Sequence, residues 1–402
     1  MMKDISGGVT APRGFLAAGM YCGIKKKVLP DLALIVSEET GPIAGVFTLN
    51  RVAAAPVLLD RQHLRKGQGR AILVNSGNAN ACTGAKGMKV AEIMARIIAD
   101  PLRTPAHTVF VGSTGVIGQP LPVEKIEAAV PALLERLSRR GGVDAAKAIM
   151  TTDLKPKQAA MQARLGGTLV TVGGMAKGSG MIHPNMATML GYLTTDAVIG
   201  RQALQRALRQ AVDRSFNCIS VDGDTSTNDT VLCLANGKAG NLTLKPGTPD
   251  FARFCEMVET VCRTLALKIC WDGEGVTKVV RIEVVKAKSV EAARQVAQTI
   301  ATSNLVKTAL FGGDANWGRV MAALGRSGVA IDQNLVSLKF GNVPMVRNGQ
   351  GLGAEAEKGL TKVFQQREFT ILVDLGQGKA SSHMWTTDLS YEYVRINASY
   401  RS

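Results

Sequence analysis

The sequence predicts an α/β (α+β) protein in which mixed sheets are layered with helices. Hydrophobic residues make up 46% of the 402 residues and aromatic residues only 4%. The chain can therefore fill about two or three domain-sized cores with aliphatic side chains. Short runs with the alternation of strands occur among longer segments with the period of helices. Because these segments do not alternate regularly, layered mixed sheets fit better than a doubly wound parallel sheet.

Strands are expected where short apolar runs end in turn residues. Residues 32–48 contain two such runs around Glu38–Gly41 and predict a hairpin. Residues 189–193 form an apolar strand directly after Thr188. Further strands are expected at residues 71–74, 108–111, 168–172, 229–235, 279–285, 336–340 and 369–374. The final stretch, residues 385–397, also alternates between apolar and polar side chains.

Helices are expected where apolar residues recur every three to four positions. In residues 201–214, Leu204, Leu208 and Val212 share one face and form a stripe that a core would bury. Pro249 predicts the start of a long helix, since proline is tolerated in a first turn. Further helices are expected at residues 85–99, 123–139, 143–150 and 290–302.

The net charge of +16 indicates that the protein attracts anions. Its basic residues are dispersed, and Lys25–Lys27 is the only run of three. Few aromatic residues are present to stack on bases, so a carboxylate-bearing metabolite fits better than nucleic acid.

Cysteine and histidine usage predicts neither disulfides nor a structural zinc site. The seven cysteines are an odd number and contain no CxxC pair. Cys255 and Cys262 lie one heptad apart in a helical pattern, which predicts buried apolar roles. The four histidines are scattered.

Neither a membrane span nor a targeting segment is expected. No apolar run is long enough to cross a bilayer. The N-terminus has no apolar segment of a secretory signal and carries an acid at Asp4. These features predict a cytoplasmic protein without membrane contacts.

Polar, glycine-containing loops follow several of the expected strands. They are Asn75–Asn80, Gly112–Gly118, Gly174–Thr188, Ser220–Asp229 and Asp272–Lys278. Loops at strand ends are where sites are usually built, so this repetition favours one convergent pocket over unrelated turns.

Familiar catalytic motifs do not account for these loops. The chain has neither GxxxxGK[ST] nor GxSxG, and His183, before Pro184, is interpreted as a loop residue. Thr188 can be an ordinary β-branched strand residue. It can also be a nucleophile if cleavage after Ala187 makes it N-terminal, since its own α-amine then acts as the base. An N→O acyl shift followed by ester hydrolysis would produce that cleavage.

The central stretch resembles the self-cleavage segment of the ornithine acetyltransferase (glutamate N-acetyltransferase) family. The matching residues there are Gly178–Ile182, Pro184–Leu190 and Thr194–Ala197. Other matching motifs follow the family order: Gly14–Gly19, Asn75–Asn80, Ser113–Gly118, Ser215–Asn217, Val221–Asp229, Asp272–Gly275, Asn316–Arg319 and Ile396–Ala398. The resemblance covers essentially the whole chain and implies an N-terminal-nucleophile-like sandwich fold.

The resemblance also implies roles for individual residues. Thr188 would be the nucleophile of self-cleavage and of acetyl transfer, and Thr114 and Gly115 would form the oxyanion hole. The substrate would be held by Thr151, Lys177, Thr188, Glu274, Asn397 and Ser402. Ser402 stands where threonine is common in the family, and it keeps the hydroxyl group.

Cleavage between Ala187 and Thr188 would give an α chain of residues 1–187 and a β chain of residues 188–402. This cut need not be a domain boundary. The family assembles as an α₂β₂ heterotetramer, so the resemblance implies the same assembly here.

The implied reaction moves an acetyl group from N2-acetyl-L-ornithine to L-glutamate in arginine biosynthesis. It would proceed through acetyl-Thr188 with ping-pong kinetics. No cofactor or metal is needed, and acetyl-CoA is a further donor if the enzyme is bifunctional. Two alternatives stay open: an aminopeptidase with the same kind of nucleophile, and a basic nucleic-acid-binding protein.

Overall fold

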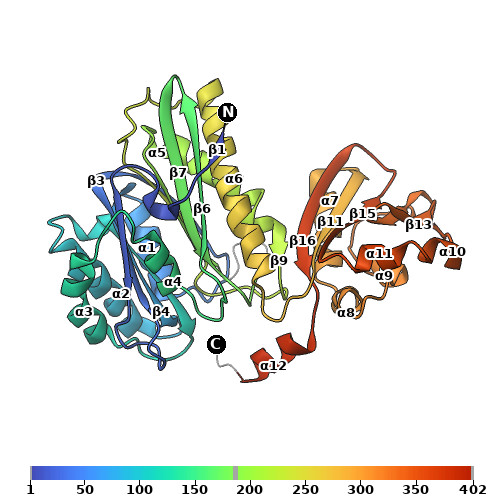
Figure 1. Cartoon of the computed structure of the whole chain (residues 1–402), viewed down its shortest axis with the longest axis horizontal. Helices are drawn as coiled ribbons and strands as arrows, with labels where there is room; N and C mark the ends of the chain where they lie inside the picture. Colours follow the sequence, from blue (N-terminus) through green and yellow to red (C-terminus); the bar gives the residue numbers. More distant parts are fainter. Residues whose placement is uncertain (1, 184–188, 400–402) are drawn as a thin grey trace. The chain divides into compact units, whose positions relative to one another are not determined.

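A computed structural model describes residues 2–183 and 189–399 (Figure 1). The described chain divides into two compact units. Unit 1 contains residues up to 217 together with 224–269, and unit 2 contains 218–223 together with the residues from 270 onward. Each unit has its own sheet.

Unit 1 is built on a nine-stranded mixed sheet among the described residues, in the order β1-β6-β7-β8-β10-β3-β4-β5, with β2 paired to β3. Its strands are β1 Lys3–Asp4, β2 Phe15–Met20, β3 Leu32–Phe47, β4 Gln68–Asn78, β5 Val109–Val116, β6 Lys157–Leu165, β7 Thr168–Lys177, β8 Leu190–Thr195 and β10 Thr230–Ala235. Its helices are α1 Ala55–Leu64, α2 Gly84–Ala99, α3 Val123–Glu135, α4 Gly142–Ala148, α5 Arg201–Asp213 and α6 Pro249–Trp271, whose last two residues count with unit 2.

The expected hairpin at residues 32–48 is wrong, because this segment is one long bent strand, β3. Its first half pairs with β2 and β4, and its last residues, from Ile43, pair with β10. The register with β4 shifts between Val36 and Gly41, where the strand changes direction. A Cβ on Gly41 would overlap the carbonyl oxygen of Ala235, so this glycine permits close approach of another strand and forms no turn.

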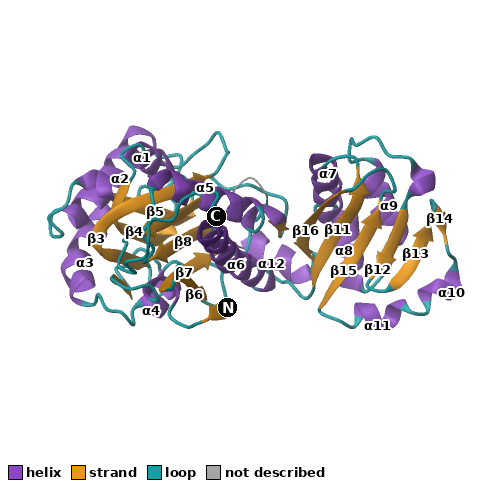
Figure 2. Cartoon of the chain, turned by 90° about the horizontal axis from the view of Figure 1, so that it is seen from above, coloured by secondary structure: helices purple, strands orange, loops and turns teal. Residues whose placement is uncertain are grey.

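The bend in β3 makes unit 1 a layered sandwich. On one face of β3, β4 and β5, residues such as Leu34 and Leu73 pack against α2 and α3. On the other face, Ile72 and Phe110 pack against Tyr192 of β8 and its neighbours. Helix α6 covers β7, and Figure 2 shows α1, α2 and α3 along the β3–β5 side. This arrangement confirms the prediction of mixed sheets layered with helices.

The two strands nearest the predicted cleavage site are direct neighbours in the sheet. Strand β7 ends at Lys177, and β8 begins at Leu190. The strands are antiparallel, with Lys177 opposite Leu190. Residues on both sides of the Ala187–Thr188 bond therefore share one sheet, while Ala187 and Thr188 themselves lie outside the described residues.

Unit 2 has a seven-stranded sheet among its described residues, in the order β14-β13-β12-β15-β11-β16-β9. The strands are β9 Ile219–Ser220, β11 Val279–Ala287, β12 Ser337–Phe340, β13 Val343–Arg347, β14 Gln350–Gly351, β15 Glu368–Asp374 and β16 Ala380–Thr387. The helices are α7 Val290–Ala301, α8 Asn304–Gly312, α9 Trp317–Gly325, α10 Ala354–Glu357, α11 Leu360–Phe364 and α12 Tyr391–Ser399.

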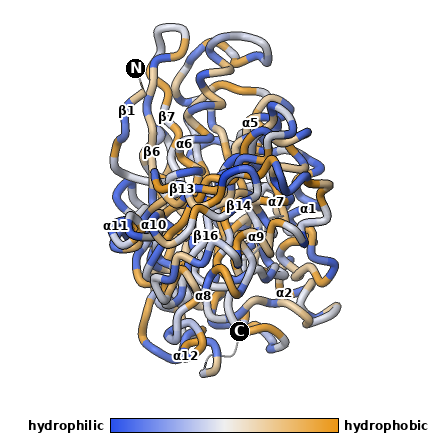
Figure 3. The backbone as a smooth tube through the Cα atoms, turned by 90° about the vertical axis from the view of Figure 1, so that its right-hand side faces the viewer, coloured by the Kyte–Doolittle hydropathy of each residue, from blue (hydrophilic) through white to orange (hydrophobic). Residues whose placement is uncertain are grey.

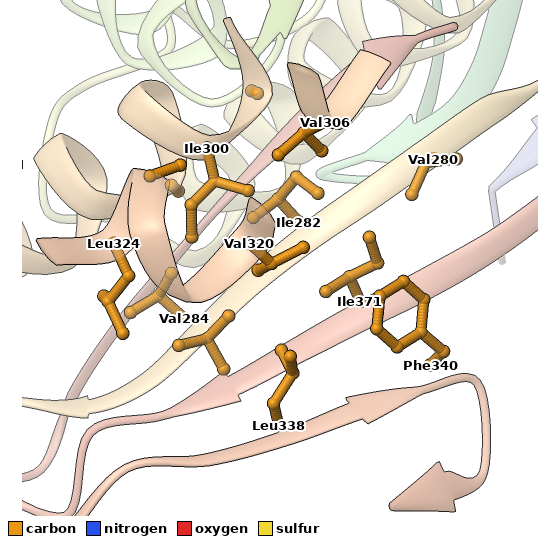
Figure 4. Packing of buried hydrophobic residues seen from close by; sticks show 14 of the residues in the cluster. Val280, Ile282, Val284, Ile300, Val306, Val320, Leu324, Leu338, Phe340 and Ile371 are labelled. Atoms are coloured by element: carbon orange, nitrogen blue, oxygen red, sulfur yellow. The ribbon is translucent and has the colours of Figure 1, made fainter. Parts of the chain in front are cut away.

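Apolar side chains, most of them aliphatic, fill the core of unit 2. Ile282 of β11 and Ile371 of β15 pack against Ile300 of α7 and Val320 of α9 (Figure 4). Residues 385–397 alternate as a strand would, but only the first part of this stretch is a strand. The segment from Tyr391 is the helix α12. None of the residues of α12 is buried, so this helix packs no apolar face into a core.

Hydrophobic residues are interspersed with hydrophilic ones along the chain (Figure 3). Within residues 2–183 and 189–399, no helix is long and apolar enough to cross a bilayer. The same residues contain no cluster of three or more histidine, cysteine or acidic side chains that could hold a metal ion. Cys262 is fully buried and Cys255 nearly so, as their spacing predicts.

Candidate active site

Thr114 and Gly115 lie at the carboxyl end of β5. Strand β5 is parallel to β4, and Gly115 pairs with Gly77 where the register becomes irregular. Gly115 has a φ of +133°, and a Cβ there would overlap the backbone of Gly77 and Asn78. Only glycine fits this position, because any side chain would push the two strand ends apart. The hydroxyl of Thr114 and the nearby backbone are thereby fixed at the sheet edge.

Three of the predicted loops of unit 1 are joined by buried hydrogen bonds. The Ser113 hydroxyl donates to Asn75 Oδ1 over 2.6 Å. The side-chain amide of Asn228 donates to the carbonyls of Ala79 and Ser113, over 2.7 and 2.8 Å. Because all the polar groups in these contacts have partners, the strand ends hold one arrangement. The structure thus brings these three loops together, as predicted, and much of the first two is paired strand. The predicted pocket itself stays a prediction.

Lys177 brings a fourth predicted loop to the same place. It is the last residue of β7 and is 3% exposed. Its Nζ donates to Thr114 Oγ1 over 3.2 Å. A residue predicted to bind substrate therefore contacts a residue predicted to form the oxyanion hole, and both belong to unit 1.

Asp153 lies next to these residues, and the sequence analysis assigned it no role. Its side chain is fully buried and forms an ion pair of 2.6 Å with Lys157 Nζ. It also accepts hydrogen bonds from the backbone amides of Thr151 and Gly178, over 3.0 and 2.8 Å. Burial alone would raise the pKa of Asp153, but the ammonium groups of Lys177 and Lys157 lower it to about 2. Asp153 is therefore ionised at neutral pH.

Lys25 extends this charged cluster. Its Nζ donates to the carbonyls of Pro30 and Met150, over 2.7 and 2.8 Å. Burial lowers the pKa of Lys25 to about 8, while Asp31 and Asp153 oppose the shift and Lys177 adds to it. The cluster holds three lysines, Lys25, Lys157 and Lys177, and the two carboxylates of Asp31 and Asp153, a balance that favours one further anion.

Asp229 holds the residue that follows Thr188. It is 1% exposed, and its Oδ1 accepts a hydrogen bond of 2.8 Å from the backbone amide of Met189. His183, which precedes the undescribed segment, interacts electrostatically with Asp224, and burial lowers the pKa of its imidazole. The described residues on both sides of the predicted cleavage bond thus interact with the Ser220–Asp229 segment, Met189 through a hydrogen bond and His183 electrostatically.

Two other predicted substrate residues lie in unit 2. Glu274 is 8% exposed, and its Oε2 accepts a hydrogen bond of 2.8 Å from Asn397 Nδ2. Gly275 follows on a tight turn with a φ of +68°. The structure therefore brings Glu274 and Asn397 together, while Ser402 lies outside the described residues.

Comparison with known proteins decides the family. Residues 16–402 match the ArgJ family. The chain belongs to the ArgJ family. It is 50% identical over 406 aligned residues to an arginine biosynthesis bifunctional protein ArgJ of Symbiobacterium thermophilum, with all of both chains covered. The expected family is therefore confirmed.

Two solved structures are similar to this chain. One from Bacillus halodurans is 41% identical and has a TM-score of 0.50, covering 52% of this chain and 98% of its own. An ornithine acetyltransferase from Mycobacterium tuberculosis, solved with ornithine, is 45% identical, with a TM-score of 0.44, and covers 46% of this chain and 98% of its own. The Bacillus likeness supports the fold class predicted from the sequence.

Sequence reasoning did not find Asp153, Lys157, Lys25 or the role of Asp229. The four-residue spacing of Asp153 and Lys157 was the one available signal, and it is common in solvent-exposed segments. Their burial depends on the pairing of β6 with β7, which the sequence does not specify. Lys25 belongs to the run Lys25–Lys27, which looks like a solvated patch.

Proposed function

We propose that this chain cleaves itself between Ala187 and Thr188 and then transfers acetyl groups from N2-acetyl-L-ornithine to L-glutamate. Membership of the ArgJ family, whose relatives are named arginine biosynthesis bifunctional proteins, supports this activity. The observation that carries it is the contact between Lys177 and Thr114 at the ends of β7 and β5. It brings a cation for a carboxylate to a hydroxyl that can stabilise an oxyanion.

In the proposed reaction, the Thr188 hydroxyl attacks the acetyl carbonyl while its α-amine takes the proton. The tetrahedral intermediate carries a negative oxygen, which the Thr114 hydroxyl and the Gly115 amide stabilise. Each such donor lowers the activation barrier by about 3–4 kcal/mol. Ornithine leaves with the proton, and glutamate then takes the acetyl group from Thr188 through its own amine. The Thr114–Gly115 backbone supports this role because its pairing with β4 fixes it before substrate binds.

The charges of the described residues suit two amino-acid substrates in turn. Lys177 presents a point charge for an α-carboxylate, and Lys25 adds to the positive potential around it. Thr151, whose amide Asp153 fixes, supplies a hydroxyl group. In unit 2, the carboxylate of Glu274, oriented by Asn397, is proposed as the partner of an ammonium group. The family resemblance also assigns a substrate-binding role to Ser402, which lies outside the described residues. No cofactor takes part in this transfer, and acetyl-CoA serves as a second acetyl donor.

The products of cleavage are an α chain of residues 1–187 and a β chain of residues 188–402, assembled as an α₂β₂ heterotetramer in the cytoplasm. The pairing of β7 with β8 supports an association that outlasts the cut, since the two fragments share hydrogen bonds within one sheet.

Transfer of a labelled acetyl group tests the reaction directly. Purified protein is incubated with N2-(¹³C-acetyl)ornithine and glutamate, and products are identified by mass spectrometry. We expect labelled N-acetylglutamate together with ornithine, at a rate that depends on both substrates. Release of labelled acetate without N-acetylglutamate would instead indicate a hydrolase, such as an aminopeptidase, and would contradict the proposal.

A further inference from the structure

We propose that Asp153 is a positioning residue whose negative charge holds Lys177 and the backbone of Thr151 and Gly178 in the arrangement that the site uses. This inference rests on the proposed function, because Lys177 and Thr151 act there as substrate-binding residues. Asp153 itself contacts no reacting atom in this account. It acts through its neighbours.

Both carboxylate oxygens of Asp153 are used. Oδ1 accepts hydrogen bonds from Lys157 Nζ over 2.6 Å and from the Gly178 amide over 2.8 Å. Oδ2 accepts a hydrogen bond from the Thr151 amide over 3.0 Å. All three donors point at one side chain that is fully buried. Hydrogen bonds to a charged group are stronger than those between neutral groups, so the three contacts favour one backbone arrangement.

These three donors come from different segments of unit 1. Thr151 lies in the turn after α4, Lys157 is the first residue of β6, and Gly178 follows the last residue of β7. Strands β6 and β7 are antiparallel neighbours, with Lys157 opposite Ala176. The carboxylate therefore ties the Thr151 turn to the start of the segment that leads toward Thr188.

The charge of Asp153 also acts on the lysines around it. Lys177 interacts electrostatically with both Asp153 and Lys25. Two ammonium groups close together repel each other, and each favours loss of the other's proton. The carboxylate of Asp153 offsets this repulsion. It thereby keeps Lys177 charged beside Thr114 and available for a substrate carboxylate.

An asparagine at position 153 would keep the shape of the side chain but would lose its negative charge and part of its capacity to accept hydrogen bonds. Its amide nitrogen is a donor, so it would face at least one of the three N–H groups that now donate to Asp153. It would also leave Lys157 buried without its carboxylate, which destabilises a protein for reasons unrelated to catalysis. A test must separate this cost from the proposed positioning.

The test compares Asp153→Asn, Lys157→Met and the double variant Asp153→Asn/Lys157→Met. Self-cleavage is followed by denaturing mass spectrometry. The kcat and KM for both substrates are measured per cleaved chain across pH, and thermal unfolding is recorded. The double variant removes the whole buried ion pair, so it isolates the loss of the Asp153 contacts with Thr151, Gly178 and Lys177.

We expect the double variant to recover thermal stability relative to Asp153→Asn yet to cleave itself about tenfold more slowly than the wild type. We also expect its KM for glutamate to rise about tenfold. The alkaline limb of kcat/KM should move down by about one pH unit, because an ammonium group that loses a neighbouring carboxylate has a lower pKa. Lys157→Met keeps Asp153 and should keep the alkaline limb of the wild type.

The proposal would be overturned if the double variant had the KM for glutamate and the alkaline limb of kcat/KM of the wild type. Asp153 would then be only a counter-charge for Lys157. If the double variant does not fold, Asp153→Glu provides the second test, because it keeps the charge and should keep the alkaline limb. A limb shifted as far as in Asp153→Asn would contradict the proposal. Failure of the proposed function is distinguishable, since the wild type would then form no N-acetylglutamate.

Discussion

The two units place charge in their interiors in different ways. In unit 1, Asp153 and Lys157 form a direct ion pair, and their side chains are 0% and 2% exposed. In unit 2, Lys307 is equally buried, but it donates to the hydroxyls of Thr386 and Thr387 and to the Thr387 carbonyl. The pair in unit 1 interacts with Lys177, which contacts Thr114, whereas the core of unit 2 is apolar and mostly aliphatic (Figure 4).

This difference indicates what each interior does. A buried carboxylate with three donors can orient neighbouring groups, and it does so at the edge of the unit 1 sheet where the predicted loops meet. A core of packed aliphatic side chains stabilises the fold without placing any chemical group. Substitutions beside the unit 1 cluster should therefore change activity, while those in the apolar core of unit 2 should change stability.

Gly115→Ala should have the largest effect. The added Cβ would overlap the backbone of Gly77 and Asn78, which displaces the strand end that carries Thr114. We expect acetyl transfer per cleaved chain to fall at least about 100-fold, as for loss of an oxyanion donor. Gly118→Ala is the matched control, because Gly118 also has a positive φ but has open space for a Cβ. A wild-type rate in Gly115→Ala would remove this residue from the oxyanion hole.

Ile371→Ala, in the core of unit 2, should lower stability and leave the activity of the folded protein unchanged. Ile371 is fully buried in the aliphatic core, so its truncation leaves a cavity. The free energy of unfolding should fall by about 2–5 kcal/mol, while Ile371→Val costs only about 0.5–1.5 kcal/mol. Chemical unfolding measures both values. A large fall in acetyl transfer per folded, cleaved molecule would break the proposed division between the units.

Lys307→Met should remove a gain in stability at alkaline pH. Burial lowers the pKa of Lys307 from 10.5 to about 8, although Asp222 and Asp388 oppose the shift. Between these values the unfolded chain binds more protons than the folded one. The free energy of unfolding therefore rises with pH over this window, by about 3 kcal/mol in total. Urea unfolding near pH 7 and pH 10 should show the rise in the wild type and in the exposed-lysine control Lys286→Met.

In Lys307→Met this contribution should be missing, so its stability should rise less between the two pH values than that of Lys286→Met. Equal rises in the two variants would show that Lys307 keeps its proton throughout. Lys307 and Lys157 would then both be charged, and they would differ only in whether a carboxylate or threonine oxygens accept their hydrogen bonds.

Acid should reveal the charge of Asp153 with a smaller effect, in which stability again rises with pH. The folded-state pKa of Asp153 is lowered from 3.8 to about 2, so the unfolded chain binds more protons between these values. The stabilisation is present above about pH 4 and is lost as the pH falls through about 2, for a total of about 2 kcal/mol. Acid unfolding of the wild type and of Asp153→Asn should converge over this window. A constant difference between them would contradict an ionised Asp153.

The layered fold and most of its elements could be predicted from hydrophobic periodicity. The stripe of Leu204, Leu208 and Val212 gave a helix that the structure places at Arg201–Asp213. The single strand β3 could not be predicted from the sequence. A glycine such as Gly41 can indicate either a turn or a close approach of two strands, and the sequence does not distinguish these two cases. The helix α12 was missed because its residues bury no apolar face.

The residues of the candidate site could be predicted where a sequence motif contains them. They could not be predicted where only the tertiary structure brings them to the site. Thr114, Gly115 and Lys177 stand in glycine-rich loops after strands, which drew attention to them. Asp153 and Lys25 stand in ordinary polar segments, and only the pairing of β6 with β7 and the turn after α4 bury them together. Long-range contacts of this kind leave no periodic signal in a sequence.

The cleavage that would create the nucleophile is the central claim, and denaturing mass spectrometry tests it most directly. The wild-type protein should give two chains, residues 1–187 and 188–402, and Thr188→Ala should give one intact chain. Lys286→Met, which changes an exposed lysine of unit 2, should cleave like the wild type. A wild-type protein that stays intact while it forms N-acetylglutamate would contradict the account, because Thr188 would then have no α-amine to act as its base.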